Sequence, residues 1–373
     1  MTERPYLSIA FTNRNDGYGG DLERRVERFI EYYGWYARHY PGLLEFVICD
    51  WNPPGDRAPL REAFDWSVCG DVTHVVVPPE LHLARYGAKA RKMLDYIGRN
   101  VALRRGAGEF SLVVNQDIFA SDSIMRQIAS RTLSRRHFYR ADRCDFNFEP
   151  CRHIDIGEFE TTALANVFSV HRRHNSANAP ISVEVTPDTL TSLGSGLELG
   201  DILDPVGYVG YCRGATLLRQ NDRLREAQPL PLDADCMDQS AWRAAYHSDA
   251  YQRGLYLHTN ASGDFILAPR AAFDEIHGMP ETTDFYMHLD SYAIMQLFAA
   301  GYEQAIYMQP HRVFHADHDR SARADAHESM TWVEHERELS RIVRGDRSYR
   351  FNGPDWGLGD ETLPTWRNGA RIK

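Results

Sequence analysis

The chain has 373 residues, 43% of them hydrophobic and 25% charged, a composition typical of a globular protein with one large or two medium domains. Its formal net charge of −10 argues against general binding to a nucleic-acid backbone, because such binding requires a basic surface. The N-terminus lacks an apolar signal core and no apolar run is long enough to span a bilayer, so we expect a cytoplasmic protein without a transmembrane segment; peripheral membrane contact stays open.

Strands and helices are expected to alternate over the first 80 residues. Residues 6–12 predict a strand, 13–20 a polar glycine-rich loop, and 22–33 a helix with apolar side chains at helical spacing. Further strands are predicted at 44–49 and 73–77. This alternation predicts an α/β fold with a mostly parallel sheet and helices on both of its faces.

Polar side chains follow the first two predicted strands. A strand, a glycine loop and a helix N-terminus together form an anion site, although the loop matches neither the dinucleotide-binding pattern nor the P-loop. Asp50 ends the second strand, where it can bond a base or a ribose, or simply form a turn. The basic segment 88–106 is expected to be a helix or helix pair whose cations approach a phosphate or stay solvated. The nucleotide-binding candidates from this half are Thr12, Asn15, Asp50, Lys92 and Asn100.

The most informative stretch is the apolar run 110–114, which ends abruptly in Asn115-Gln116-Asp117. Its composition suits a strand buried on both faces, and ligands of open α/β sheets bind beyond the carboxyl ends of strands. A carboxylate there can hold a divalent cation that in turn holds a diphosphate, whereas a polar turn is the alternative. We therefore predict that Asp117 is a metal ligand and that Asn115 lies against the nucleotide as a weak or water-mediated partner of the metal.

Five short segments follow one another along the first half of the chain, at 8–14, 47–50, 99–104, 108–110 and 115–117. Their order and motifs resemble the nucleotide-sugar-binding half of GT-A glycosyltransferases, particularly the family 2-like enzymes. In that family a helix with the pattern Arg-Asn-x-Gly/Ala-x-x-x-Ala-x-Gly-Glu precedes the strand that delivers an Asp-x-Asp metal motif, which here reads Asn-Gln-Asp. The resemblance covers residues 6–125 and 256–320.

The second half of the resemblance supplies the acceptor side. Gly263 and Asp264 match a Gly-Asp-Phe-like turn of the acceptor half and are expected to contact the acceptor. Asp290 matches the final acid of the family's acidic pair, which supplies the catalytic base, while Leu289 replaces the other acid. A helix N-cap is the alternative role for Asp290. The alternative bases are Glu281 and Asp284.

A histidine cluster follows at residues 311–319. In metal-dependent relatives a histidine at the position of His315 completes the coordination, so we predict that His315 binds the metal together with Asp117. His318 is the alternative ligand, and an exposed loop or a zinc site are alternative readings of the cluster. Imidazole nitrogen and carboxylate oxygen suit Mn²⁺ or Mg²⁺, with histidine favouring Mn²⁺.

The resemblance implies a GT-A fold in four segments. These are a nucleotide-sugar-binding half at 1–140, a loop-rich acceptor insertion at 141–255, a catalytic half at 256–320, and a C-terminal helix and tail at 321–373. The implied activity is an inverting, metal-assisted transfer of a sugar from a nucleotide diphosphate, expected to be UDP, to a hydroxyl of a glycan or glycoconjugate. The cation neutralises the leaving diphosphate and a positioned base deprotonates the acceptor.

Two other functions compete with this interpretation. A nucleotidyltransferase with a related sheet would require a Gly-x-Gly-x-Arg loop, which residues 13–20 do not supply. A catalytically degenerate nucleotide-sugar-binding protein or scaffold is favoured by the departures at Asn115 and Leu289.

Overall fold

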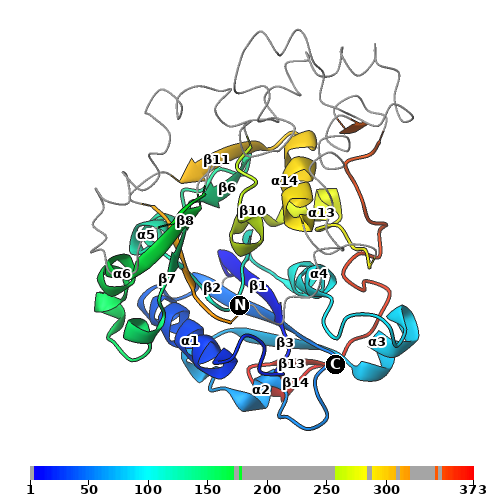
Figure 1. Cartoon of the computed structure of the whole chain (residues 1–373). Coiled ribbons are helices and arrows are strands. Elements are labelled where there is room, and N and C mark those ends of the chain that lie inside the picture. The colour runs from blue at the N-terminus through cyan, green and yellow to red at the C-terminus, as the bar shows by residue number, and fades with distance from the viewer. Residues whose placement is uncertain are drawn as a thin grey trace.

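The computed structural model describes residues 4–171, 176–178, 257–283, 288–307, 311–319, 341–342 and 347–373. Within these residues, nine strands form a central sheet (Figure 1). Their order across the sheet is β11 (Glu303–Tyr307), β6 (His137–Ala141), β10 (Ile266–Pro269), β4 (Phe110–Val113), β1 (Leu7–Asn13), β2 (Leu44–Trp51), β3 (Val72–Val77), β13 (Thr365–Arg367) and β14 (Ala370–Arg371).

The sheet is parallel at its centre and mixed on both flanks. Strands β4, β1, β2 and β3 run parallel, as the sequence predicts. Strand β10 is antiparallel to both of its neighbours, β4 and β6, and β13 is antiparallel to β3. Because β10 and β11 flank β6, the described parts of the first and third predicted segments share one sheet.

Helices cover both faces of this sheet (Figure 1). On one face lie α1 (Leu22–His39), α2 (Leu60–Ala63) and the short turn η1 (Ser67–Cys69). The other face carries α4 (Asp95–Arg105), α13 (Arg270–Ile276) and α14 (Leu289–Ala299), and α3 (Pro79–Tyr86) follows β3. The mixed α/β architecture with helices on both faces is therefore confirmed.

Helix α4 sits unusually close to β1. A Cβ atom on Gly98 would lie 2.3 Å from Thr12 Oγ1, so glycine is what allows this approach. In the segment 88–106, which was expected to be a helix or helix pair, α4 covers only Asp95–Arg105. Arg99 and Asn100 are buried on this helix, whereas Lys89 and Lys92 before it are exposed.

A second sheet of five strands packs beside the first in the described part of the chain. Its order is β5 (Ile118–Ala120), β12 (Val313–Ala316), β7 (Arg143–Phe146), β8 (Val167–His171) and β9 (Ser176–Asn178), accompanied by α5 (Asp122–Ala129), η2 (Glu149–Cys151) and α6 (Ile156–Ala165). Strand β12 pairs with β5 on one side and β7 on the other. This pairing brings residues 311–319 next to the end of β4.

The C-terminal tail packs against the core. Trp356 is buried, and Trp366 in β13 pairs with His74 of β3. Of the predicted C-terminal helix and tail at 321–373, only residues 341–342 and 347–373 are described. The predicted acceptor insertion beyond residue 178 lies outside the described residues.

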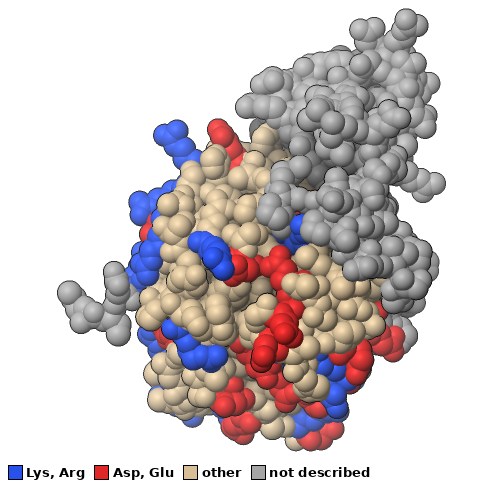
Figure 2. Space-filling view, turned by 90° about the vertical axis from the view of Figure 1, so that its left-hand side faces the viewer, with Lys and Arg blue, Asp and Glu red and all other residues tan. Residues whose placement is uncertain are grey.

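Two further observations concern surface and solvent. In the part of the chain that the structure describes, no helix is both long enough and apolar enough to cross a bilayer. Acidic side chains gather in a band across the face seen in Figure 2, in keeping with the negative net charge. The four described cysteines are buried free thiols: Cys49, Cys69, Cys144 and Cys151.

Candidate metal and nucleotide site

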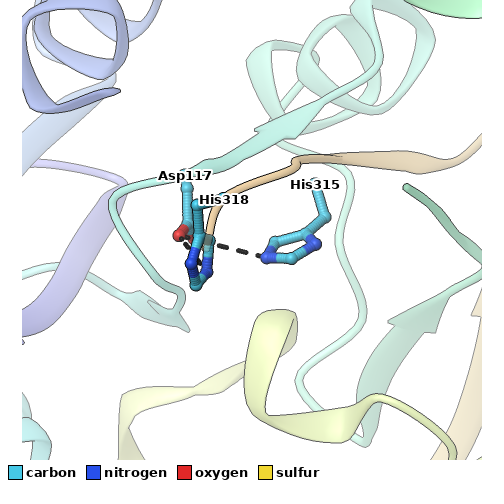
Figure 3. A group of neighbouring side chains, drawn as sticks. All are labelled: Asp117, His315 and His318. Carbon is cyan, nitrogen blue, oxygen red and sulfur yellow. Dashed lines mark ion pairs between the residues drawn. The ribbon is translucent and has the colours of Figure 1, made fainter. Parts of the chain in front are cut away.

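Asp117, His315 and His318 form a compact group at the end of β4. One ligand atom from each of the three lies within 4.8 Å of the others. The carboxylate Oδ2 of Asp117 is 3.5 Å from His318 Nε2 and 3.9 Å from His315 Nε2. Figure 3 shows the imidazole of His315 pointing toward Asp117 and His318. The structure therefore brings together both predicted metal ligands and the histidine that was their alternative.

Pairing between strands brings Asp117 and His315 together, although they are distant in the sequence. Asp117 lies in the turn between β4 and β5, and His315 on β12 pairs with Ile118 of β5. The Ala316 amide donates to the Asp117 carbonyl at 2.9 Å. His315 is thus set by a strand, while His318 lies two residues beyond the end of that strand, between the exposed Asp317 and Asp319.

A second carboxylate orients His315. Asp145 on β7 lies with Oδ1 3.2 Å from His315 Nδ1, which leaves Nε2 directed at Asp117. Burial alone would raise the pKa of Asp145, but hydrogen bonds from His171 and His315 and the charge of Arg143 outweigh it and hold that pKa well below its usual range. Histidines that bind metals commonly carry such a carboxylate on their other nitrogen. Sequence reasoning missed Asp145, because nothing in the local pattern around it indicates the pairing of β7 with β12.

These residues fit a divalent metal ion. Asp117 is buried, and its Oδ1 has no hydrogen-bond partner among the described residues. Burial lowers the pKa of His318, which favours the neutral imidazole that binds metals. One carboxylate and two imidazoles suit Mn²⁺ better than Mg²⁺, and Zn²⁺ accepts the same donors.

The glycine-rich loop lies directly against this group. Gly17, Gly19 and Gly20 all have positive φ angles, and the amide of Asp319 donates to the Gly19 carbonyl at 3.2 Å. A Cβ atom on Gly19 would lie 2.7 Å from His318 Nδ1, so only glycine allows the loop so near. A pocket of about 320 Å³ opens here, lined by the loop, His318 and the chain around η2.

Asp290, the predicted base, lies next to the turn that contains Gly263 and Asp264, the predicted acceptor-binding residues. The Oδ2 atom of Asp290 accepts hydrogen bonds from the Gly263 amide at 2.5 Å and from Ser262 Oγ at 3.0 Å, both in the short turn η4 (Ser262–Asp264). Helix α14 begins at Leu289, so Asp290 lies in its first turn and not at the N-cap. Of the alternative bases, Glu281 bonds Asn100 and the Gly357 amide, and Asp284 lies outside the described residues.

Arg99 and Asn115 link the turn η4 to the metal ligands. Arg99 donates to Asn115 Oδ1 and to the Gly263 carbonyl, each at 2.5 Å. Asn115 in turn donates through Nδ2 to Asp264 Oδ1 at 2.9 Å. Burial would raise the pKa of Asp264, but the adjacent Arg143 outweighs it and lowers the pKa to about 2. Because Arg143 also bonds Asp145, a continuous polar chain runs from the predicted base to His315.

Two of the nucleotide-binding candidates lie at neighbouring strand ends. Asp50 is fully buried, and its Oδ2 accepts from the Leu60 amide at 2.9 Å while Oδ1 has no partner among the described residues. Burial raises the pKa of Asp50 to about 6. Asn15 donates to the Ala58 carbonyl at 2.9 Å, and its Oδ1 likewise has no described partner.

The other three candidates are engaged elsewhere or exposed. Thr12 Oγ1 donates to the Cys49 carbonyl at 3.1 Å and packs against α4. Asn100 is fully buried and bonds both the amide and the carbonyl of Met279. Lys92 is exposed, and its carbonyl accepts from Asn52. Their contact with a nucleotide stays a prediction, and the described bonds of Thr12 and Asn100 are internal to the protein.

The chain matches no model of a known protein family, and no curated protein matches it.

Proposed function

We propose that the protein is a metal-assisted glycosyltransferase of the GT-A type. It would move a sugar from a nucleotide diphosphate, expected to be UDP, to a hydroxyl of a glycan or glycoconjugate. The observation that carries this proposal is the group of Asp117, His315 and His318 at the carboxyl end of β4, beside a glycine-rich loop. In open α/β sheets this is where ligands bind, and nitrogen and oxygen donors there suit a cation that holds phosphate oxygens.

Asp117, His315 and His318 are the residues that would hold the cation. When bound, the cation supplies charge neutralisation of the leaving diphosphate. Asp145 would keep His315 in the orientation that directs Nε2 toward the cation, through its bond to Nδ1. Since Asn115 is hydrogen-bonded to Arg99 and Asp264, its part would be to support the turn η4, the proposed acceptor turn, next to the metal.

Asp290 is the proposed general base. The bonds that described residues make to it go to Oδ2, which fixes the carboxylate and leaves Oδ1 to accept the proton of an acceptor hydroxyl. An inverting transfer through an oxocarbenium-like transition state requires one such base and no protein nucleophile. The acceptor class follows from the family resemblance alone.

A calorimetric titration tests the proposal. The purified chain is titrated with UDP, GDP, CMP and TDP, each in Mn²⁺ and in EDTA, and Asp117→Asn serves as the matched variant. We expect one nucleotide to bind in a Mn²⁺-dependent manner, with binding lost in the variant. Metal-independent binding would point to a cation-free transferase, and no binding of any nucleotide would overturn the proposal in favour of the scaffold.

A further inference from the structure

Arg25 is a buried cation whose hydrogen-bond donors are only partly satisfied. It lies in the first turn of α1 with a fully buried side chain. Its Nη2 donates to the Tyr18 carbonyl at 2.7 Å, while Nε and Nη1 have no hydrogen-bond partner among the described residues. Burying a guanidinium with two unsatisfied nitrogens is unfavourable, so a cation of this kind suggests an anion that arrives from outside.

The position of Arg25 indicates where that anion would bind. A Cβ atom on Gly19 would lie 3.0 Å from both Nη1 and Nη2 of Arg25 and 2.7 Å from His318 Nδ1. The guanidinium and the imidazole therefore flank the same glycine. Burial lowers the pKa of Arg25, and the negative charge of Asp117 opposes this shift, in keeping with the shared neighbourhood of the guanidinium and the candidate metal ligands.

Because the guanidinium of Arg25 and a bound cation would both be positive at neighbouring positions, the binding of the cation and the binding of the diphosphate would depend on each other. A divalent cation held by Asp117 and two neutral histidines would be repelled by Arg25 as long as no anion is present. A diphosphate removes the repulsion, because its oxygens accept from the guanidinium and coordinate the cation at once. Arginine suits this task, since its planar fork matches phosphate oxygens and it keeps its charge when buried.

Building on the proposed function, we propose that Arg25 is the second positive charge of the diphosphate site and makes the binding of cation and diphosphate mutually dependent. The coupling is reciprocal: pyrophosphate tightens Mn²⁺ binding by the same factor by which Mn²⁺ tightens pyrophosphate binding. The glycine at position 19 is then required because any side chain there would separate the loop from both Arg25 and His318.

The experiment measures this coupling with Mn²⁺ and inorganic pyrophosphate, which need neither a base nor a sugar. The full chain is titrated with each alone and with both together, and Arg25→Met is compared with wild type. We expect the affinity for Mn²⁺–pyrophosphate to fall about tenfold to 100-fold, the loss of charge-assisted hydrogen bonds, while Mn²⁺ alone binds equally well or better. The matched control is Arg24→Gln on the exposed side of the same helix turn, which should change neither.

Two results would overturn the inference. One is an unchanged affinity of Arg25→Met for Mn²⁺–pyrophosphate, and the other is an equal loss for Mn²⁺ alone, which would assign Arg25 a purely structural role. If Arg25→Met does not fold, Arg25→Lys decides, because it keeps the charge and loses the fork: weaker pyrophosphate binding with unchanged Mn²⁺ binding supports the inference, and no change in either overturns it.

The inference and the proposed function fail in different ways. Arg25-dependent binding of pyrophosphate without binding of any nucleotide would overturn the transferase and keep the anion site. Mn²⁺-dependent nucleotide binding that is insensitive to Arg25→Met would keep the transferase and overturn the role of Arg25.

Discussion

Asp145 offers the sharpest test of the metal site, because it touches His315 and no other member of the candidate ligand group. In Asp145→Asn, the side chain keeps its shape and one acceptor oxygen but loses its charge. That one oxygen has to serve both His315 and His171, which each lie 3.2 Å from a carboxylate oxygen in the wild type. The Asn amide would therefore replace one carboxylate acceptor with a donor, so at least one of the two imidazoles has to change its bond to residue 145, and Arg143 loses a counter-charge.

The expected loss can be stated as a range. Removing the outer partner of a metal-bound histidine typically costs 10-fold to 100-fold in metal affinity, or about 1.4–2.7 kcal/mol. We expect the upper part of that range, because Asp145 is buried and its charge is little screened. The assay is a Mn²⁺ titration followed by the electron paramagnetic resonance signal of the free ion, with folding monitored by circular dichroism.

The chain provides a closely matched control in Asp142→Asn. Asp142 Oδ1 lies 3.2 Å from the buried His258 Nε2, the same kind of pair at the same distance, but His258 is not part of the candidate metal group. Both variants should lose stability through a weakened carboxylate–histidine pair, and only Asp145→Asn should lose Mn²⁺. Equal Mn²⁺ affinity in the two variants would refute the argument that Asp145 positions a ligand.

Three further predictions concern the rest of the site. Asp290→Asn should leave Mn²⁺-dependent nucleotide binding within about threefold of wild type and lower the rate of sugar transfer at least about 100-fold, the usual contribution of a general base. An assay with donor and acceptor sugars measures the rate, and a larger loss of binding than of rate would contradict the prediction. Burial raises the pKa of Asp50 from 3.8 to about 6, so the wild type loses stability as the pH rises from about 4 to 6. Asp50→Asn should therefore raise the free energy of unfolding at pH 7.5 by about 2–3 kcal/mol and have little effect at pH 4. The same variant should weaken nucleotide binding. Chemical denaturation at the two pH values checks the sign, and an equal gain at both would show that ionisation is not the cause. Asn115→Asp should destabilise the fold by about 1–3 kcal/mol without strengthening Mn²⁺ binding, which a thermal scan and a Mn²⁺ titration measure together; a gain in Mn²⁺ affinity would show that position 115 faces the metal.

The central strands could be predicted because their apolar runs are buried against helices and strands that lie next to them in the sequence. The strands predicted at 6–12, 44–49 and 73–77 occur as β1, β2 and β3 with ends shifted by one or two residues. The antiparallel direction of β10 could not be predicted, because its neighbours in the sheet, β4 and β6, are distant from it in the sequence. The hydrophobic pattern of a strand does not indicate which strand, distant in the sequence, will be its neighbour in the sheet.

The same limit applies to the site. Asp117 and His315 could be predicted to share an edge of the sheet because each ends or lies near an apolar run. Asp145 could not be placed beside them, because its position depends on β7 pairing with β12. Arg99 belongs to the basic segment whose cations were expected to approach a phosphate or stay solvated, and it is buried and paired with Asp95 one helical turn away at 2.7 Å. The i, i+4 spacing of these two residues was the signal that could have indicated a paired arginine.

Asn115 was the strongest argument for a degenerate site, and its hydrogen bonds give it a different meaning. Its Oδ1 accepts from Arg99 and its Nδ2 donates to Asp264, so the position requires one acceptor and one donor. A carboxylate at 115 could accept from Arg99, but it would face Asp264 as a second negative charge with nothing to donate. The amide is therefore what the connection between β4 and the acceptor turn needs. Since His318 lies within reach of Asp117, the group keeps three nitrogen and oxygen donors without any contribution from position 115. If the proposed site binds a cation, His318 would take the place of a ligand at position 115, so Asn115 does not by itself favour the scaffold.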